Sequence, residues 1–376
     1  MVTRSAVVQD FFFAPGGAEE VAVALADLLP GSDVVTSFMD PVYRPRLAGH
    51  RIRTWPLQRL LGATKRYRSF LPLYPLWFGG LDLRDRDLVV SSSSAFAKAV
   101  RTRKSATHIA YIHAPMRYAW DLEGYLAGSS ISLPSRIAAR TLRPWLRRWD
   151  RATAQRSDVL VANSAAVAAR IRRFWDREAR VIHPPVPLEE IELSTRDDGY
   201  LLVAARMLAY RRLDVAVAAA NVLGRDLLLV GSGPQERALR SIAGPHVRFE
   251  PPAGRAHLRE LMANCHAYLV PGEEDFGMAP VEAMAAGKPV VALAAGGALE
   301  TVIDGVTGVH VATSDPATFA AGIERLDSLL LDPAAIRAHA LTFAPAVFRL
   351  KMRALFAELG VDPTLYVGAE AGRDHG

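Results

Sequence analysis

Two glutamates eight residues apart, Glu274 and Glu282, stand in the run EEDFGMAPVEAMAAGKPVV at residues 273–291. The apolar segment before the run is typical of a buried strand, Gly277 allows a tight backbone approach, and Pro280 suits the first position of a helix. The unpaired N–H groups at a helix N-terminus favour phosphate. An acid in the first helical turn also complements the helix dipole, which would explain Glu282 but not Glu274. The pattern therefore predicts a site for an anionic ligand.

Arginines follow an apolar segment earlier in the same half of the chain, at Arg206 and at the pair Arg211 and Arg212. A guanidinium fork matches two phosphate oxygens at once. A solvated helix start is the plainer explanation, but cations at a helix N-terminus oppose the helix dipole. We therefore expect these arginines to face a bound anion.

Two glycine-rich turns could also approach a phosphate. Gly16 and Gly17 follow the first apolar segment, and Gly231 and Gly233 follow another one. The first turn is equally typical of an ordinary strand–helix connection. The second resembles part of a dinucleotide fingerprint but lacks its third glycine, so a nicotinamide dehydrogenase is a minority interpretation. We take all four glycines as candidates for binding the phosphates of a nucleotide.

The loop HAPMRYAWD (113–121) mixes chemical types after an apolar segment. His113 could donate to a developing negative charge or hold a sugar hydroxyl, although a lone histidine is more often structural. Arg117, Trp120 and Asp121 combine a cation, an aromatic ring and an acid. Such a mixture suits contact with carbohydrate.

The elements that must position these residues follow an alternating pattern. Apolar segments alternate with helical stretches, which is typical of parallel strands buried on both faces. The predicted strands are 5–9, 33–37, 87–92, 108–113, 158–163, 180–186, 200–205, 226–231, 247–250, 267–270, 289–294 and 308–312. The proline-rich and charged run 183–199 joins the two halves. The sequence therefore predicts an α/β chain of two doubly wound sheets, with every motif above at the carboxyl ends of strands, where ligands bind.

Composition narrows the class of protein. A chain of 376 residues that is 50% hydrophobic can bury two cores. Its one cysteine, Cys265, excludes an internal disulfide and favours a reducing, cytoplasmic location. No apolar run reaches the roughly 18 residues that span a bilayer. The net charge of +6 comes mainly from arginine, and no nucleic-acid-binding pattern accompanies it, so we expect no nucleic acid partner.

The chain resembles the retaining glycosyltransferases of family 4, whose GT-B fold pairs two facing Rossmann-like domains. EDFGMAPVEAMAAGKPVV is similar to the Glu-seven-Glu signature of the family, with Glu274 and Glu282 at the required spacing. ARMLAYRRLD is similar to its phosphate-binding stretch, in which an arginine is followed five residues later by a lysine. Here Arg206 matches and Arg211 replaces the lysine. HAPMRYAWD and ANSAAVAARIRRFW resemble the subgroup that contains mannosyltransferases of polysaccharide assembly.

The resemblance implies how the donor would be held. Glu274 would bind sugar hydroxyls near the anomeric carbon. The backbone around Phe276, Gly277 and Met278 would assist it. Glu282 would take the ribose hydroxyls of the nucleotide.

The resemblance also implies the reaction. Arg206 and Arg211 would neutralise the diphosphate leaving group beside Gly17, with His113 next to the sugar on the acceptor side. A hexose would pass with retained anomeric configuration to a hydroxyl of a saccharide, lipid-linked or small-molecule acceptor. Mannose from GDP-mannose is the first choice of donor, and UDP- and dTDP-sugars stay open. The resemblance implies no essential metal. It implies no cofactor either, because the nucleotide sugar is consumed as the donor substrate. A nucleotide-sugar epimerase on the same fold is the alternative.

The family's domain plan places residues 1–189 in an acceptor-side domain and 190–345 in a donor domain, with the C-terminal helix, 346–376, packed back on the first domain. Membrane contact stays open. The stretch 136–151 carries arginines and tryptophans at helical spacing, which fits either a helix on the inner face of an anionic membrane or a packed helix with a wet basic face. The apolar segment 67–81 fits either a lipid-linked acceptor or the core.

Overall fold

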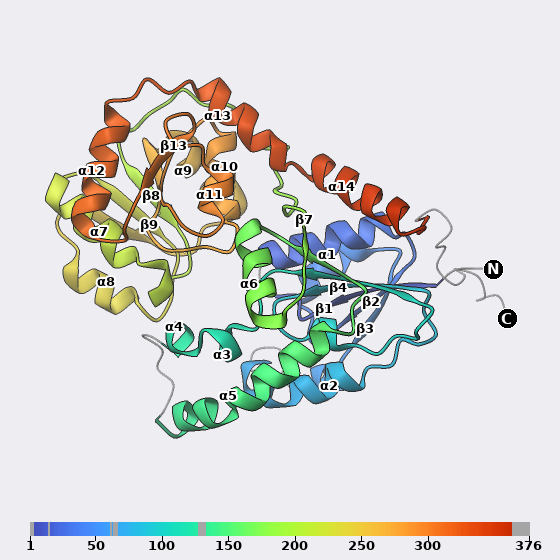
Figure 1. Cartoon of the computed structure of the whole chain (residues 1–376). Helices are drawn as coiled ribbons and strands as arrows, with labels where there is room; N and C mark the ends of the chain where they lie inside the picture. The colour runs from blue at the N-terminus through green and yellow to red at the C-terminus, as the bar shows by residue number, and fades with distance from the viewer. Residues whose placement is uncertain (1–3, 14–15, 61, 63–66, 127–132, 363–376) are drawn as a thin grey trace.

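The computed structural model describes residues 4–13, 16–60, 62, 67–126 and 133–362, which form two parallel sheets flanked by helices (Figure 1). The first sheet has seven strands in the order β3-β2-β1-β4-β5-β6-β7, and the second has six in the order β10-β9-β8-β11-β12-β13. The prediction of a two-domain α/β fold is confirmed. Within the described residues, no helix is both long and apolar enough to cross a membrane.

The first sheet and its helices occupy the first half of the chain. The strands are β1 Ser5–Gln9, β2 Asp33–Thr36, β3 Arg51–Thr54, β4 Leu88–Ser93, β5 Thr107–Ile112, β6 Val159–Ala162 and β7 Arg180–Val181. The α-helices are α1 Gly17–Leu28, α2 Tyr74–Gly80, α3 Arg117–Trp120, α4 Leu122–Leu126, α5 Leu133–Ala154 and α6 Ala165–Trp175. Short 3₁₀ helices are η1 Pro41–Tyr43, η2 Pro45–Leu47, η3 Pro56–Arg59, η4 Tyr67–Leu73 and η5 Ala97–Ala99.

The second sheet follows the same alternating plan. Its strands are β8 Leu201–Ala204, β9 Leu227–Val230, β10 Val247–Glu250, β11 Ala267–Val270, β12 Val290–Leu293 and β13 Gly308–Val311. The helices are η6 Ala209–Arg211, α7 Leu213–Leu223, α8 Glu236–Ile242, α9 Arg255–Asn264, α10 Met278–Ala285, α11 Ala298–Thr301, α12 Pro316–Asp327, α13 Pro333–Ala340, η7 Leu341–Phe343 and α14 Pro345–Glu358.

Strand β3 is missing from the sequence prediction, and β7 is shorter than predicted. β3 reads RIRT and lies at the edge of the sheet, where its two arginines are exposed, so it shows no apolar run. β7 keeps only two of the seven predicted residues because Pro184 and Pro185 have no N–H to donate to a neighbouring strand.

Each sheet is covered by apolar residues on both faces. In β1, Val7 belongs to one core cluster and Ala6 and Val8 belong to the cluster on the other face. This alternation follows from the two-residue period of a strand. A continuous apolar strand is therefore stable only because helices cover both sides.

Helix α14 follows the second domain in sequence but packs on the first. Phe348, Met352 and Phe356 are buried in the same cluster as Leu25 of α1. Figure 1 shows α14, in red, extending from the second domain along α1. The rest of the predicted C-terminal element, 363–376, lies outside the described residues.

Candidate active site

The first turns of α1 and α10 meet at the junction between the domains. Strand pairs in both sheets are parallel, so the loops after β1 and β11 leave from carboxyl ends. A Cβ atom on Gly17 would lie only 2.6 Å from Met278 Sδ, which places the two helix starts in direct contact. Their unpaired N–H groups therefore open into the same junction, where an anion would be favoured.

Helix α10 starts earlier than the sequence predicts. It begins at Met278 after Gly277, whose φ of 88° is the left-handed conformation that glycine adopts most easily. Pro280 is therefore the third helical residue, and the prediction that it is the first is wrong. Glu282 falls in the second turn, and the first turn carries no acidic residue. The helix dipole thus does not explain Glu282.

Glu282 is a half-buried carboxylate without a hydrogen-bond partner among the described residues. Burial raises its pKa to about 7, and the charge of Glu20 adds to this effect, while Arg255 and Arg259 oppose it. A buried acid with open oxygens is costly unless a donor reaches it. The side chain is thus suited to accept hydrogen bonds from ligand hydroxyls.

Glu274 forms an ion pair with Arg211. The Glu274 carbonyl accepts the N–H of Gly297 at 2.9 Å, which holds the loop before α10 against the loop after β12. Burial works against the charge on Arg211, but Glu274 outweighs it and raises the pKa of the guanidinium. Arg211 Nε is buried and has no partner among the described residues. The pair therefore keeps one N–H available for a further acceptor.

Arg206 takes no part in that ion pair. Its side chain is exposed and forms no ion pair or hydrogen bond within the described residues. Gly231 and Gly233 support its loop: Cβ atoms there would lie 2.1 Å from the Ala205 carbonyl oxygen and 2.5 Å from that of Met207. These two glycines thus allow a close approach between protein backbones.

Glu20 links the domains from the first turn of α1. Arg46 donates to both of its oxygens, at 2.8 and 2.7 Å, and Arg255 of α9 forms a second ion pair with it. These cations outweigh burial and lower the pKa of Glu20. Its neighbour Glu19 is buried with a pKa raised to about 7 by burial. Neither glutamate is among the predicted site residues, because nothing in their spacing marks an interdomain contact.

His113 closes β5 beside the junction, with Nε2 at 2.8 Å from Ser92 Oγ. Burial lowers the pKa of the imidazole to about 4, although Asp275 opposes the shift. The ring is therefore neutral near pH 7. It can hold a hydroxyl, but it is not a cation.

Asp275 was not among the predicted site residues, yet it joins the two domains through two arginines and a serine. Arg117 and Arg170 each reach it at 2.6 Å, and Ser164 Oγ donates to its carbonyl at 2.6 Å. Burial raises its pKa, but the two arginines outweigh burial and lower it. Arg117, predicted to contact the acceptor, thus fastens the first domain to the loop that carries Glu274.

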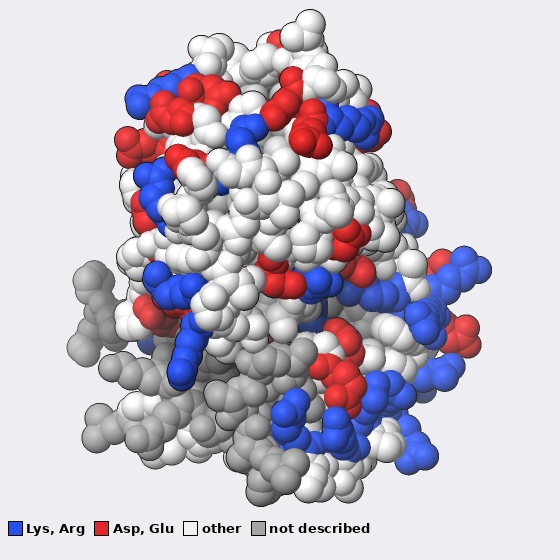
Figure 2. Space-filling view, turned by 90° about the vertical axis from the view of Figure 1, so that its left-hand side faces the viewer, with Lys and Arg blue, Asp and Glu red and all other residues white. Residues whose placement is uncertain are grey.

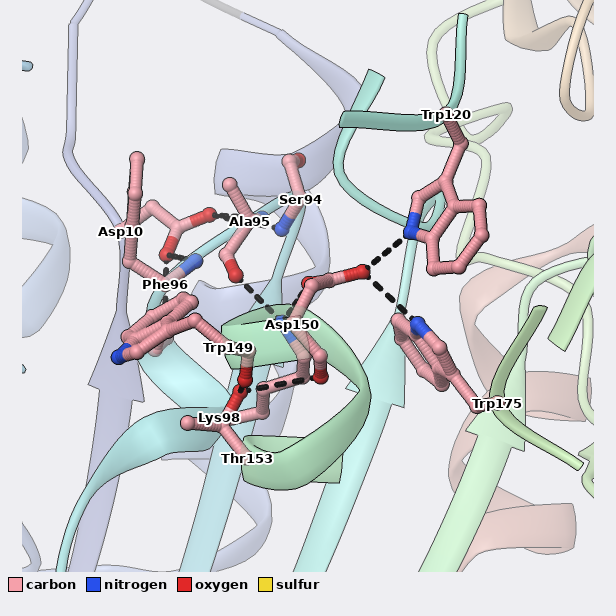
Figure 3. Close-up of polar contacts among 11 residues, drawn as sticks. Asp10, Ser94, Ala95, Phe96, Lys98, Trp120, Trp149, Asp150, Thr153 and Trp175 are labelled. Atoms are coloured by element: carbon pink, nitrogen blue, oxygen red, sulfur yellow. Dashed lines mark hydrogen bonds and ion pairs between the residues drawn. The ribbon is translucent and has the colours of Figure 1, made fainter. Parts of the chain in front are cut away.

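The other two predicted acceptor contacts, Trp120 and Asp121, point elsewhere. Trp120 Nε1 donates to Asp150 at 2.7 Å, inside the first domain (Figure 3). The ring of Trp120 stacks on Phe174 with centroids 4.4 Å apart. Asp121 Oδ1 accepts the N–H of Gly124 at 3.2 Å. Trp120 therefore serves the first domain, whereas the charge of the exposed Asp121 still acts on Arg117.

Phe276 is buried against His183 and Phe343, with centroids 5.5 Å from each. It supports the loop between Glu274 and Gly277 from below. Within the described parts of the chain, no group of three or more His, Cys, Asp or Glu side chains could hold a metal ion.

Sequence profiles of known families match both halves of the chain. The family described as Glycosyltransferase Family 4 matches residues 15–190, and Glycosyl transferases group 1 matches residues 198–328. D-inositol 3-phosphate glycosyltransferase 1 of Catenulispora acidiphila is 34% identical over 226 residues, covering 51% of this chain and 51% of that protein. The D-inositol 3-phosphate glycosyltransferase of Frankia alni is 37% identical over 158 residues, covering 37% and 38%. The chain thus spans about half the length of these relatives or less.

Solved structures show the same fold along nearly the whole chain. Sucrose-phosphate synthase from Thermosynechococcus elongatus has a TM-score of 0.69 at 20% identity, covering 95% of this chain and 99% of that one. Anabaena HepE, in complex with UDP and glucose, has a TM-score of 0.68 at 16% identity, covering 94% and 100%. The fold is GT-B, and the chain belongs to the glycosyltransferases of family 4.

Proposed function

We propose that the chain transfers a hexose from a nucleoside diphosphate sugar to a hydroxyl of an acceptor, with retention of anomeric configuration. The observation that carries this proposal is the placement of Glu274 and Glu282 on the loop and helix that face the first turn of α1. One acid is paired to the half-buried Arg211, and the other has no partner among the described residues. This arrangement offers a charged subsite and a hydroxyl-binding subsite side by side.

In this proposal the diphosphate lies between the starts of α1 and α10. Arg211, with its free Nε–H, would stabilise the charge that develops on the leaving phosphate, and the helix N–H groups would add to it. Glu282 would take the ribose hydroxyls and Glu274 the sugar hydroxyls. The donor would thereby compete with Glu274 for Arg211.

The acceptor would enter from the first domain, beside His113. Because its imidazole is neutral, His113 would position a hydroxyl and would not donate positive charge. The departing phosphate oxygen would accept the acceptor proton on the same face of the sugar. This route needs neither a metal nor a cofactor, and it retains configuration at the anomeric carbon.

The sequence motif and the named relatives suggest which donors and acceptors to test. The mannosyltransferase-like run HAPMRYAWD supports GDP-mannose, whereas HepE was solved with UDP and glucose. The relatives are named for transfer to D-inositol 3-phosphate, which makes that phosphorylated cyclitol the first acceptor to test beside saccharide and lipid-linked acceptors.

The test has two stages. Thermal melting with GDP-mannose, UDP-glucose and the free nucleotides identifies the donor, because a ligand bound only by the folded chain raises its melting temperature. Transfer is then measured with the donor and the acceptors above. Glu274→Gln should retain a melting shift and lose about 10²-fold or more in turnover. A melting shift without transfer to any acceptor would contradict the proposal, and an epimerised sugar from donor alone would replace it with the epimerase.

We also propose a cytoplasmic location with α5 on the inner face of a membrane. Trp149 packs in the core, but Ile137, Leu142 and Trp145 are about half exposed (55%, 48% and 47%). Figure 2 shows Lys and Arg side chains gathered, with a few acids, at the lower right of this face. Cosedimentation with anionic vesicles tests this contact: Trp145→Ser should weaken it, and equal sedimentation would contradict it.

A further inference from the structure

A second basic site lies at the edge of the first sheet that faces away from the domain junction. It is an open cavity of about 690 Å³. Its charged lining residues are Arg84, Arg101, Arg103, Lys104, Arg156 and Asp158. They belong to the segments just before β4, β5 and β6, so they lie at the amino ends of the strands. The junction residues lie at the carboxyl ends of the same strands, and the cavity is therefore a separate place on the domain.

The cations of this cavity are only partly neutralised. Arg101 Nε donates to the Gly79 carbonyl at 2.7 Å, and Arg156 donates to the Ala99 carbonyl at 2.5 Å. Lys104 forms no hydrogen bond or ion pair within the described residues. Carbonyl oxygens satisfy N–H groups without cancelling a full charge. Three positive charges therefore face the cavity without a paired acid.

The acids near the cavity offset only part of its positive charge. Asp82 pairs with Arg84, and Asp87 pairs with Arg103 and also accepts the N–H of Arg4 at 2.8 Å. Asp158 Oδ2 accepts the N–H of His108 at 2.7 Å, so Asp158 keeps its own negative charge in the lining, where the cations outnumber it. Arg103 Nε nevertheless stays buried without a partner in the described part of the chain. The cavity thus has an unfilled N–H in addition to unpaired charge.

Like charges in this cavity disfavour one another. Burial lowers the pKa of Arg156, and the neighbouring charge of Arg101 lowers it further. An anion between these groups would relieve both effects, because an opposite charge favours the charged form. The geometry of the lining and the mutual repulsion of its cations thus both favour a bound anion.

We propose that this cavity binds a phosphate group, carried either by a small soluble molecule or by a lipid headgroup. Two arginines and a lysine around an open cavity match the several oxygens of a phosphate, since the guanidinium forks bind two oxygens each and the ammonium acts as a point charge. The cavity lies across the sheet from the proposed donor site. Its ligand is therefore distinct from the nucleotide sugar, and this proposal does not depend on the proposed transfer reaction.

The experiment compares variants of the full chain. Arg101→Gln with Lys104→Gln removes two of the unpaired cations, and Lys351→Gln with Arg353→Gln removes the same residue types from the exposed side of α14. Each chain is titrated calorimetrically with glycerol phosphate, and is floated with phosphatidylcholine vesicles with and without phosphatidic acid. We expect the affinity of the Arg101/Lys104 variant for the phosphate probe to fall by about tenfold or more. The α14 variant should bind the probe like the unchanged chain.

The two probes identify the source of the phosphate. If the Arg101/Lys104 variant loses affinity for glycerol phosphate, the ligand is a small soluble molecule. If it loses only its binding to vesicles that contain phosphatidic acid, the ligand is a lipid headgroup. If the Arg101/Lys104 variant still floated with phosphatidic acid vesicles like the unchanged chain, the membrane contact would come from α5 alone. That result would overturn binding of a lipid headgroup in this cavity. Equal binding by all three chains, or no binding of either probe, overturns the proposal. Lys104→Gln alone keeps the test valid if the double variant fails to fold, because Lys104 makes no bond that folding needs.

Discussion

Two acid–base pairs of this molecule, Lys98–Asp150 and Arg211–Glu274, have the same chemistry and opposite surroundings. Lys98 and Asp150 lie 2.6 Å apart with side chains 1% and 0% exposed. Figure 3 shows Asp150 also accepting the indole N–H groups of Trp120 and Trp175, at 2.7 and 2.8 Å. Both oxygens of the acid accept buried donors, and the side chain is closed to solvent, so neither oxygen is open to a ligand.

The pair at the junction is only partly satisfied. The side chains of Arg211 and Glu274 are 24% and 21% exposed, and Arg211 Nε has no partner in the described chain. A buried charge network that is complete stabilises one conformation, whereas an incomplete one is stabilised by what binds to it. The comparison teaches that saturation of hydrogen bonds, more than charge or burial, separates a structural pair from a binding pair.

The largest expected effect comes from breaking the complete network. Asp150→Ala leaves the buried Lys98 ammonium with only the Ala95 carbonyl and leaves two indole N–H groups without an acceptor, which should destabilise the first domain by about 3–5 kcal/mol. All six tryptophans precede residue 189, so tryptophan fluorescence in urea reports on this domain alone. Asp121→Ala, at an exposed acid, should cost less than about 1 kcal/mol. An unchanged midpoint for Asp150→Ala would show that the network adds no stability.

Removing Arg211, the arginine of the incomplete pair, should lower turnover more than it lowers stability. Arg211→Gln deletes the cation that would stabilise the leaving diphosphate, so we expect kcat to fall about 10²-fold. Initial rates at saturating donor and acceptor measure this change. Arg206→Ala should also lower kcat, because Arg206 is proposed to face the same phosphates.

Arg240→Gln is the matched control, since Arg240 is exposed and pairs with Glu236 on α8, away from the junction. Its turnover should equal that of the unchanged chain. If Arg211→Gln or Arg206→Ala kept full kcat and only weakened acceptor binding, neither arginine would stabilise the leaving group.

The difference between the two pairs also explains what could be predicted from the sequence. Glu274, Arg211 and Gly17 lie in the segments that lead from a strand into the next helix, and the carboxyl ends of parallel strands gather such segments at one edge, so their positions follow from local pattern. Strand β3 could not be predicted in this way, because an exposed edge strand needs no apolar run.

Contacts between the domains could not be predicted from local pattern. Asp275 receives Arg117 and Arg170 from the other domain, and Glu20 receives Arg255 from α9. The sequence spacing of such partners depends on how two separate sheets dock. The partner of Trp120 could not be predicted either, because Asp150 lies 30 residues away on α5. Without that partner, the sequence left Trp120 as a candidate for contact with the acceptor.

The smallest expected effect is a pH dependence that comes from the open acid Glu282. Its pKa rises from 4.5 to about 7 on folding, so the folded chain binds more protons than the unfolded chain between these values. The free energy of unfolding therefore falls as pH rises from 4.5 through 7. Because the side chain is half-buried, solvent screening limits the change to the order of 1 kcal/mol. Urea unfolding followed by circular dichroism across this pH range measures it.

Glu282→Gln should flatten that dependence and stabilise the ligand-free chain near pH 7, where the unchanged side chain is becoming charged. Glu19, whose pKa is also raised to about 7, supplies the part of the slope that remains. Glu236→Gln, at a surface acid already paired to Arg240, should leave the slope unchanged. If Glu282→Gln left the slope as steep as before, Glu282 would already be satisfied in the folded chain. The number of hydrogen-bond partners would then no longer distinguish the acids of the proposed donor site from the buried acid Asp150.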